Sequence, residues 1–230
     1  MFRTMFKSGR AGMLGICMGL WSLSGGQAWA VEEPAYEVVR AYPAFELRRY
    51  APYLVAETEV SGDFDAVGNE AFRILADFIF GNNQRQEKMK MTAPVSQRPA
   101  AMEIGDLDEV AISTSVTQRV EAGADPDTYV LSFVMPSQYT RETLPEPVDP
   151  RVRIREEPAR LMAVRRYSGR WTQGNYREHE ALLLQAIAKV GLQPVSATVY
   201  ARYNSPFSLW FLRRNEVLVE VRPPQQIFPD

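Results

Sequence analysis

LRRYAPYLVA, the stretch Leu47–Ala56, is matched 107 positions later by IREEPARLMA, the stretch Ile154–Ala163. The match continues without a gap to Ser61-Gly62 in the first copy and to Ser168-Gly169 in the second, and a helical pattern follows each Ser-Gly. This period is far too long for a solenoid repeat of about 20–50 residues. We therefore predict two β-hairpin–helix–β units related by a pseudo-two-fold axis. Because the identity between the copies is low, chance similarity between amphipathic strands is the alternative interpretation.

Two such units can join their strands into one curved sheet or barrel, with both helices on its outside. The predicted strands are Tyr36–Arg40, Phe45–Tyr50, Pro52–Val60, Met91–Gln97, Val110–Val120, Tyr129–Met135, Arg151–Glu156, Arg160–Tyr167, Thr198–Tyr203 and Glu216–Val221. Tyr129–Met135 is apolar almost throughout, which is typical of a central strand. Pro94 should confine its strand to an edge or a bulge, because proline cannot donate to the ladder. Arg98–Leu107 and Pro136–Pro150 are predicted loops.

Two stretches carry a helical pattern. The first is predicted over Phe64–Phe80, where apolar residues spaced by three and four make two adjacent stripes. One stripe holds Phe64, Val67, Ala71, Ile74 and Phe78, and the other holds Phe72, Leu75 and Ile79. Together the stripes are wider than a helix needs to lie on a sheet. The second helix is predicted over Asn175–Val190, with Thr172 as its cap and Gly191 as its stop.

The first 30 residues have the layout of a secretory signal peptide. A basic start without acids precedes the apolar run Ala11–Leu23, and Ala28-Trp29-Ala30 offers a cleavage site before Val31. The apolar run is shorter than the about 20 residues that span a membrane comfortably. Cys17 raises a lipoprotein as an alternative, but the bulky Ile16 before it argues against lipidation. We expect cleavage after Ala30, export to the periplasm, and a single domain over residues 31–230.

Removal of the signal peptide would change the composition of the chain. Cys17 is the only cysteine, so the mature protein would have no thiol, no disulfide and no cysteine-based metal site. Arg3, Lys7 and Arg10 would also be lost, which leaves 23 basic against 28 acidic residues and a net charge of −5. An acidic domain without a basic stretch is a poor nucleic-acid binder, since phosphate neutralisation drives that binding.

Several short motifs resemble one known family, the SOUL haem-binding proteins. The motifs are Phe45-Glu46-Leu47-Arg48-Arg49-Tyr50, Val55-Ala56-Glu57-Thr58, Ala71-Phe72-Arg73, Ile79-Phe80-Gly81-Asn82, Lys90-Met91-Thr92-Ala93-Pro94-Val95, Phe133-Val134-Met135-Pro136, Tyr203-Asn204-Ser205-Pro206 and Arg214-Asn215-Glu216-Val217. They occur in order between about Tyr36 and Val221, and several ordered motifs are stronger evidence than one short match.

The resemblance implies an α+β fold, a distorted antiparallel β-barrel flanked by two helices and built from two similar halves. It also implies binding of haem or another porphyrin, and no established reaction. Some members have a histidine proposed as an axial ligand in the first half. This chain has no histidine before His179, which departs from that pattern and puts histidine-ligated haem in doubt.

The first helix and the segment after it supply the candidate ligand-binding residues. An apolar wall with a few cations at its rim would suit a porphyrin that carries carboxylate tails. The candidates are Phe72, Arg73, Ile79, Lys88, Met89, Lys90 and Met91. The alternative is a helix simply buried on the barrel with solvated charges at its end, in which Met91 is a core residue and Met89 a loop residue.

Met91 and His179 are the candidate axial ligands of a haem iron. A Met sulfur can be a weak iron ligand, and its soft surface suits a flat ring. His179 lies on the second helix beside Glu178 and Glu180, and the favoured interpretation is a partly exposed helix residue.

The segment Phe207–Leu212 places five apolar residues in a predicted loop, followed by Arg213-Arg214. It could plug the barrel end, cover a ligand, or contact a membrane or a protein partner. Plugging is the simplest of these interpretations and the one we favour.

No enzyme signature occurs in the sequence: there is no histidine pair for zinc, no nucleophile elbow and no phosphate-cradling glycine loop. We therefore predict no catalytic residue and no structural metal. The first hypothesis is a periplasmic tetrapyrrole-binding or carrier protein that holds its ligand by apolar contact. The second is an interaction module that binds a partner or membrane and no tetrapyrrole. The third is a tetrapyrrole-modifying enzyme, which a buried acid facing the cleft would favour.

Overall fold

A computed structural model describes residues 31–100 and 127–222 of the chain, all within one compact unit, Val31–Asp230. The predicted signal peptide, the predicted strand Val110–Val120 and most of the loop Arg98–Leu107 lie outside the described residues.

The described elements follow the predicted order closely. The strands are β1 (Tyr36–Ala41), β2 (Glu46–Tyr50), β3 (Tyr53–Ser61), β4 (Val95–Pro99), β5 (Thr128–Val134), β6 (Arg153–Glu157), β7 (Arg160–Tyr167), β8 (Gln193–Pro194), β9 (Val199–Arg202) and β10 (Asn215–Arg222). The helices are α1 (Phe64–Ile79), α2 (Gln173–Lys189) and a short 3-10 helix (Trp210–Leu212). The sequence did not predict β8 and the 3-10 helix, which are too short to show a periodic pattern.

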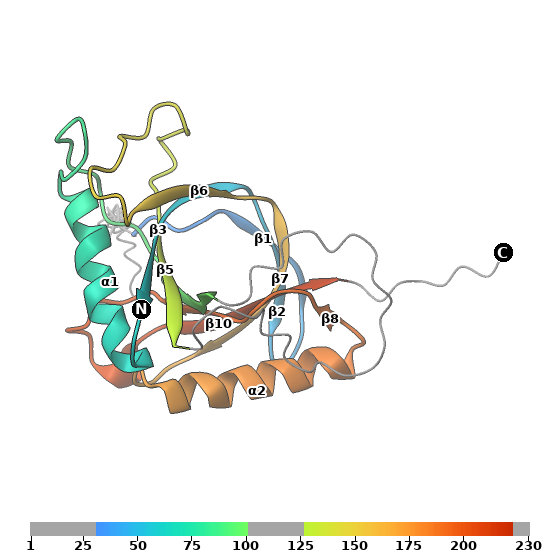
Figure 1. Ribbon diagram of the computed structural model, residues 1–230. Helices are drawn as coiled ribbons and strands as arrows, with labels where there is room; N and C mark the ends of the chain where they lie inside the picture. The colour runs from blue at the N-terminus through green and yellow to red at the C-terminus, as the bar shows by residue number, and fades with distance from the viewer. Residues whose placement is uncertain (1–30, 101–126, 223–230) are drawn as a thin grey trace, which may run out of the picture. The chain divides into compact units, whose positions relative to one another are not determined.

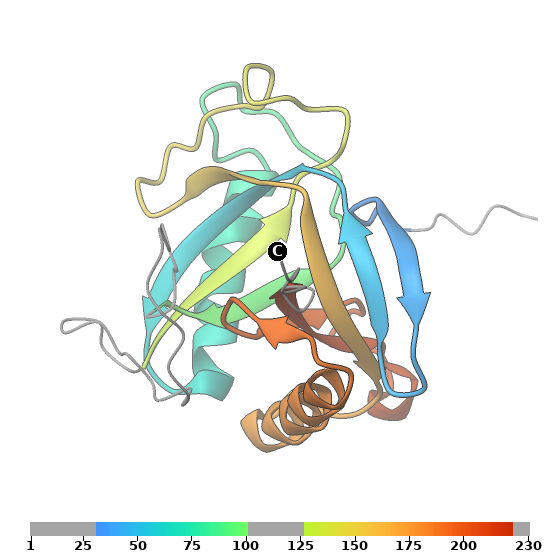
Figure 2. The same cartoon turned by 90° about the vertical axis from the view of Figure 1, so that its right-hand side faces the viewer.

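The strands form one antiparallel sheet that curls into a distorted, incompletely closed barrel (Figures 1 and 2). The strand order is β1-β2-β7-β10-β9-β4-β5-β3-β6, and β8 pairs with β10 off this path. The predicted α+β fold of a distorted antiparallel barrel with two flanking helices is confirmed.

The internal repeat appears in the strand order, but its strands pair differently from the prediction. The two strands of each predicted hairpin do not pair with each other: β2 pairs with β7, and β3 pairs with β6. The registers of the two pairs are equivalent. Glu46 lies opposite Val164 in one pair, and Arg153 lies opposite Glu57 in the other. Arg153 follows Glu46 by 107 positions, and Val164 follows Glu57 by the same 107 positions. Each copy therefore contributes strands to the other, and the pseudo-two-fold axis passes through the central pair β4–β9.

Pro94 does not mark an edge strand, so this expectation is wrong. β4 lies in the middle of the sheet, between β5 and β9. Pro94 directly precedes Val95, the first residue of β4, and follows a cis peptide bond from Ala93. A proline just before the strand removes no donor from the ladder, and this position is compatible with a central strand.

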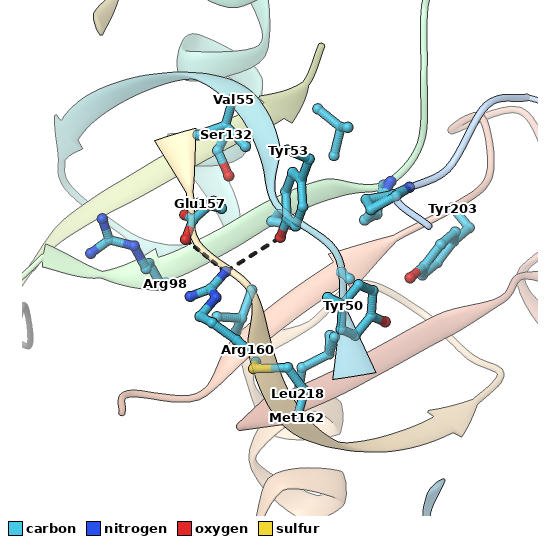
Figure 3. A pocket seen from close by; sticks show the side chains of 16 residues that line it. Tyr50, Tyr53, Val55, Arg98, Ser132, Glu157, Arg160, Met162, Tyr203 and Leu218 are labelled. Atoms are coloured by element: carbon cyan, nitrogen blue, oxygen red, sulfur yellow. Dashed lines mark hydrogen bonds and ion pairs between the residues drawn. The ribbon is translucent and has the colours of Figure 1, made fainter. Parts of the chain in front are cut away.

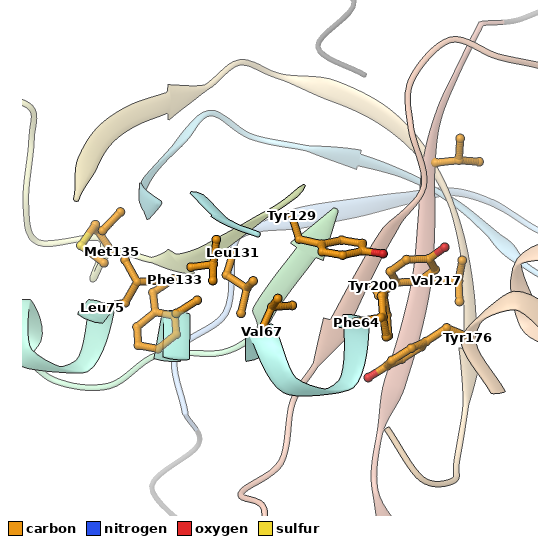
Figure 4. Packing of buried hydrophobic residues seen from close by; sticks show 14 of the residues in the cluster. Phe64, Val67, Leu75, Tyr129, Leu131, Phe133, Met135, Tyr176, Tyr200 and Val217 are labelled. Carbon is orange, nitrogen blue, oxygen red and sulfur yellow. The ribbon is translucent and has the colours of Figure 1, made fainter. Parts of the chain in front are cut away.

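The two faces of the sheet bury different sets of side chains, as strand alternation requires. The outer face packs against α1 and α2 and forms the larger core (Figure 4). Phe64 of α1 is central to it, because its ring makes edge contacts with Tyr129, Tyr176 and Tyr200 at centroid distances of 5.3, 5.4 and 5.7 Å. The inner face forms a smaller cluster around Met162.

Each helix begins at a side-chain cap and is held by its apolar face. The Asp63 carboxylate accepts hydrogen bonds from the amides of Asp65 and Ala66 at the start of α1, and Thr172 accepts one from Asn175 in α2. In α1 both predicted stripes are buried except for the half-buried Phe72. The apparently excessive apolar face of α1 is therefore mostly used against the sheet.

Candidate functional site

The concave face of the curled sheet encloses a small inner hollow, shown in Figure 3. Alternation along β3, β7 and β10 turns Tyr53, Val55, Met162 and Leu218 toward this hollow, while their neighbours face the helices. The free volume is about 50 Å³. This space is far below the roughly 300–1,000 Å³ of pockets that hold small molecules.

Three tyrosines contribute to the polar lining of the hollow: Tyr50, Tyr53 and Tyr203. Burial raises the pKa of all three phenols above the ordinary value of 10, and at Tyr203 the neighbouring Glu216 carboxylate adds to the effect. The phenols therefore remain neutral near pH 7 and act as hydrogen-bonding groups.

A buried ion pair lies behind Tyr50 and Tyr203, two of the tyrosines that line the hollow. Nη1 of Arg48 lies 3.0 Å from Oε2 of Glu216, and Nη2 lies 3.3 Å from Oε1, so the pair is bidentate. The Tyr203 hydroxyl donates to the same carboxylate at 2.6 Å, and Nε of Arg214 donates to it at 3.1 Å. Both partners of the pair are almost fully buried. A buried charge is tolerated when it is paired and hydrogen-bonded in this way.

The wall of the hollow holds a second charged group around Glu157, which is also buried. Oε2 of Glu157 lies 2.7 Å from Nη2 of Arg160, and Oε1 contacts Arg155. The Arg160 guanidinium also donates to the Tyr53 hydroxyl at 3.3 Å (Figure 3). Glu157 in the wall and Glu216 behind it are therefore both ion-paired with arginine.

A larger mouth cavity of about 550 Å³ opens beside the hollow and shares Pro34, Tyr53 and Val134 with it. Its apolar walls come from β3, the end of β5 and the loop after β5. Its charged lining is Glu32, Glu33, Arg141, Glu142 and Glu156. This cavity is large enough for a ligand, but its lining is acidic.

The predicted ligand-binding residues line neither of these two cavities. They lie on α1 and on the segment that follows it. The Met89 amide donates to the Ile79 carbonyl at 2.9 Å, which holds the segment Lys88–Met91 beside the end of α1. Arg73 in α1 and Lys88 and Lys90 in this segment are exposed.

Two of the predicted residues are core residues in the structure. Ile79 is 1 % exposed and Met89 is 5 % exposed, whereas Met91 is 39 % exposed. The alternative interpretation is therefore wrong for Met91, which is exposed, whereas Met89 lies in the loop after α1 as expected but with its side chain buried. The tether between Met89 and Ile79 turns the Met89 side chain inward. Phe80 is an exposed aromatic residue at the same end of α1 that the sequence reasoning missed, although it directly follows the second apolar stripe.

His179 lies on α2, on a different element from the other candidates. Its ring stacks on Tyr167 with the centroids 3.9 Å apart, and its Nδ1 accepts a hydrogen bond from Nε of Arg165 at 3.4 Å. Burial and the Arg165 charge lower the pKa of His179, so the imidazole stays neutral near pH 7. This placement agrees with a partly buried helix residue.

Phe207–Leu212 does not plug the barrel, so the favoured interpretation of this segment is wrong. Its five apolar side chains are all exposed, and Trp210–Leu212 forms a 3-10 helix at the surface. A hydrogen bond attaches the loop to the segment that precedes α2: the Gly169 amide donates to the Trp210 carbonyl at 3.2 Å. This attachment turns the apolar side chains away from the sheet.

Residues 31–100 and 127–222 contain neither a metal-ligand cluster nor a membrane-spanning helix. Over these ranges no cluster of three or more His, Cys, Asp or Glu side chains is placed to hold a metal ion. In the same part of the chain, no helix is long and apolar enough to cross a membrane.

The curled antiparallel sheet and its two flanking helices define an α+β fold of the distorted-barrel class. The sequence identifies the family within this class. Residues 31–220 match the family model described as SOUL heme-binding protein. The chain therefore belongs to the SOUL family, as its motifs predicted.

Curated relatives cover most of the chain. The chain is 28% identical over 206 residues to Heme-binding protein 2 of Homo sapiens, and this alignment covers 82% of the chain and 89% of that protein. It is 26% identical over 180 residues to Heme-binding protein 1 of Xenopus tropicalis, covering 75% and 85% respectively.

Solved structures share the fold at low identity. The C-terminal domain of EcmrR superposes with a TM-score of 0.53 at 11% identity, covering 81% of this chain and 98% of that domain. An uncharacterized conserved protein from Listeria innocua gives a TM-score of 0.53 at 11% identity, covering 84% and 94%. These likenesses concern the fold alone.

Proposed function

We propose that the protein binds haem or a related tetrapyrrole, mainly by apolar contact and without a reaction of its own. The observation that carries the proposal is the family match over residues 31–220, which spans almost all of the described fold. The relatives that cover most of the chain carry the name heme-binding protein.

The charges of the molecule favour the end of α1 as the binding site. Haem carries two carboxylates, and the mouth cavity presents four glutamates against one arginine, so it would repel such a ligand. The inner hollow is too small without rearrangement. By contrast, Arg73 of α1 and Lys88 and Lys90 in the segment beside the end of α1 are exposed cations.

The apolar part of this site would come from Phe72, Phe80 and Met91. Phe72 is half-buried and packs on Phe133 of β5 at a ring distance of 5.3 Å, so one side of its ring is held by the sheet. Phe80 and Met91 are more exposed. Ile79 and Met89 support this surface from below. Met91 remains the candidate axial ligand of the site, and a soft thioether suits a weak bond to haem iron.

A haem titration followed by the Soret absorption band tests the proposal, with the chain Val31–Asp230, which contains every described element. We expect a saturable one-to-one shift. The double variant Lys88→Glu/Lys90→Glu should bind at least about tenfold more weakly, because charge-assisted contacts to the carboxylates become repulsive. Lys189→Glu makes the same kind of charge reversal at a single lysine at the far end of α2 and should leave binding unchanged.

Two further variants identify the iron ligand. Loss of the Soret shift in Met91→Ala assigns the sulfur of Met91, and loss in His179→Ala assigns the imidazole instead. A shift that neither variant changes indicates apolar holding without these ligands. A haem titration that never reaches saturation would contradict tetrapyrrole binding and favour an interaction module that binds a partner.

The enzyme hypothesis has less support. It calls for a buried acid in the cleft that can donate a proton to the ligand. Glu157 lines the hollow and Glu216 is buried behind it, but both are paired with arginine guanidinium groups. A carboxyl group whose oxygens are engaged by guanidinium groups is poorly placed to donate a proton to a ligand.

We also propose that the protein acts in the periplasm after removal of residues 1–30. The basic start, apolar run and small-residue site of this segment support export. N-terminal sequencing of the protein from the periplasmic fraction should begin at Val31. Retention of Cys17 with an attached lipid would contradict this cleavage and favour the lipoprotein.

A further inference from the structure

We infer that the loop Phe207–Leu212 docks the protein on an anionic lipid surface. This inference does not depend on tetrapyrrole binding. The loop presents its apolar side chains to solvent to an unusual degree: Phe207 is 95% exposed, Leu212 67% and Trp210 50%. Contiguous exposed apolar residues of this kind mark interaction sites, because solvent exposure of so many large side chains is otherwise unfavourable.

The backbone of the loop is held in place, so the exposure of its side chains is built into the fold. The Arg213 guanidinium donates to the carbonyls of Ser208 and Pro206 at 2.9 and 2.7 Å. The same group stacks on the ring of Trp171, 4.2 Å from its centroid. Together with the bond from Gly169 to Trp210, these contacts attach the loop to the start of α2. A rigid apolar projection loses little entropy when it binds.

The sequence segments at the loop are rich in arginine, although the chain as a whole is acidic and Asp65 of α1 reaches the same end, where it accepts a hydrogen bond from the Gln173 amide at 3.1 Å. Two segments build this end of the molecule, residues 166–177 and residues 202–214. They contain six arginines and no aspartate or glutamate. The arginines are Arg166, Arg170, Arg177, Arg202, Arg213 and Arg214. Arg214 is paired with Glu33 and Glu216, whereas Arg166, Arg170 and Arg177 are exposed cations.

This combination fits a bilayer surface better than a protein groove. Trp210 and its aromatic neighbour Phe211 meet edge to face with centroids 5.5 Å apart, and large aromatic side chains favour the membrane interface. Arg170 lies over the Trp210 ring, at 5.8 Å from its centroid, where it could reach a lipid phosphate while the ring inserts. Apolar side chains surrounded by arginine are typical of interfacial anchors on anionic membranes.

Co-sedimentation with vesicles tests the inference, with the chain Val31–Asp230 so that residues 1–30 cannot anchor it. We expect binding to vesicles of equal parts phosphatidylglycerol and phosphatidylcholine, weaker binding to phosphatidylcholine alone, and a blue shift of tryptophan emission. The triple variant Phe207→Ser/Leu209→Ser/Leu212→Ser should bind at least about tenfold more weakly, because it removes three insertable side chains.

Control variants distinguish binding through this loop from non-specific adsorption of the protein to vesicles. Val148→Ser/Val190→Ser removes exposed apolar side chains elsewhere and should bind as the parent does. Arg166→Gln/Arg170→Gln should lose the preference for anionic vesicles. Thermal unfolding confirms that each variant is folded. The inference is overturned if no vesicle is bound, if the triple variant binds like the parent, or if the loop instead mediates a dimer by sedimentation without vesicle binding.

Discussion

Single side chains explain why the inner face of the sheet tolerates charge. Arg48 and Glu216 are both removed from water, and each is satisfied by the other and by Tyr50 or Tyr203. The sequence shows these residues only as members of strands. Their pairing was not predictable, because they are 168 positions apart and meet only when β2 and β10 flank β7 in the sheet.

His179 gives a pH-dependent prediction at the residue scale. Its pKa is lowered by burial and by the Arg165 guanidinium, against a smaller opposing effect of Glu178. The unfolded chain therefore binds a proton more readily near pH 6.5, and the stability contributed by neutral His179 is lost as the pH falls through this region. His179→Phe keeps the ring stack on Tyr167 without a titrating group.

Urea unfolding at pH 8 and pH 5 measures this effect. From pH 8 to pH 5 the parent protein should lose more stability than His179→Phe, because carboxylates contribute equally to both. An equal loss in the two proteins would show that His179 does not contribute to the pH dependence.

At the scale of elements, the two Ser-Gly junctions of the repeat have a shared geometry. Gly62 and Gly169 each connect a strand to the start of a helix with φ of +145° and +140°. Residues that carry a side chain rarely adopt this backbone conformation, so glycine is strongly favoured at both positions. The repeat in the sequence reflects this geometric need.

Alanine at these junctions should destabilise the protein unequally. Gly169→Ala would place its Cβ 2.6 Å from Nδ2 of Asn175, whereas Gly62→Ala meets only Val67 Cγ1 at 3.4 Å. We expect a loss of about 1–3 kcal/mol at Gly169 and a smaller loss at Gly62, measured by urea unfolding. Gly174→Ala, in the first turn of α2 with nothing within 4 Å, should be neutral or stabilising. A larger loss at Gly62 than at Gly169 would contradict this account.

The helices were predictable at this scale, whereas the role of their surfaces was not. Residues at spacings of three and four indicated α1 and its buried side correctly. The width of the apolar face of α1 suggested that part of this face lines a ligand-binding site, but the sheet covers most of the face. How much of a helix face is covered depends on the partner surface, which periodicity does not describe.

At the scale of the whole molecule, the two copies are interlocked. Each copy supplies a strand to the other, through β2 with β7 and β3 with β6. Neither copy can complete its own side of the sheet, because its strands would have unpaired edges.

This interlocking predicts that the two halves fold only together. Residues 31–134 alone and residues 150–222 alone should lack a cooperative thermal transition in circular dichroism, since each would lack its partner strands. The two fragments produced together should recover the spectrum and transition of Val31–Asp230. A cooperative transition in either isolated half would contradict the interlocked arrangement.

The sequence by itself determined the α+β class, the order of the described elements, the repeat and the family. These features depend on local periodicity, turn residues and ordered motifs, which a linear chain contains. Only the tertiary structure decided which strands exchange partners, that Met89 is buried while Met91 is exposed, and that Phe207–Leu212 faces solvent. The physical reason is that pairing and burial depend on residues distant in the chain, and several strands of similar pattern could have served as partners.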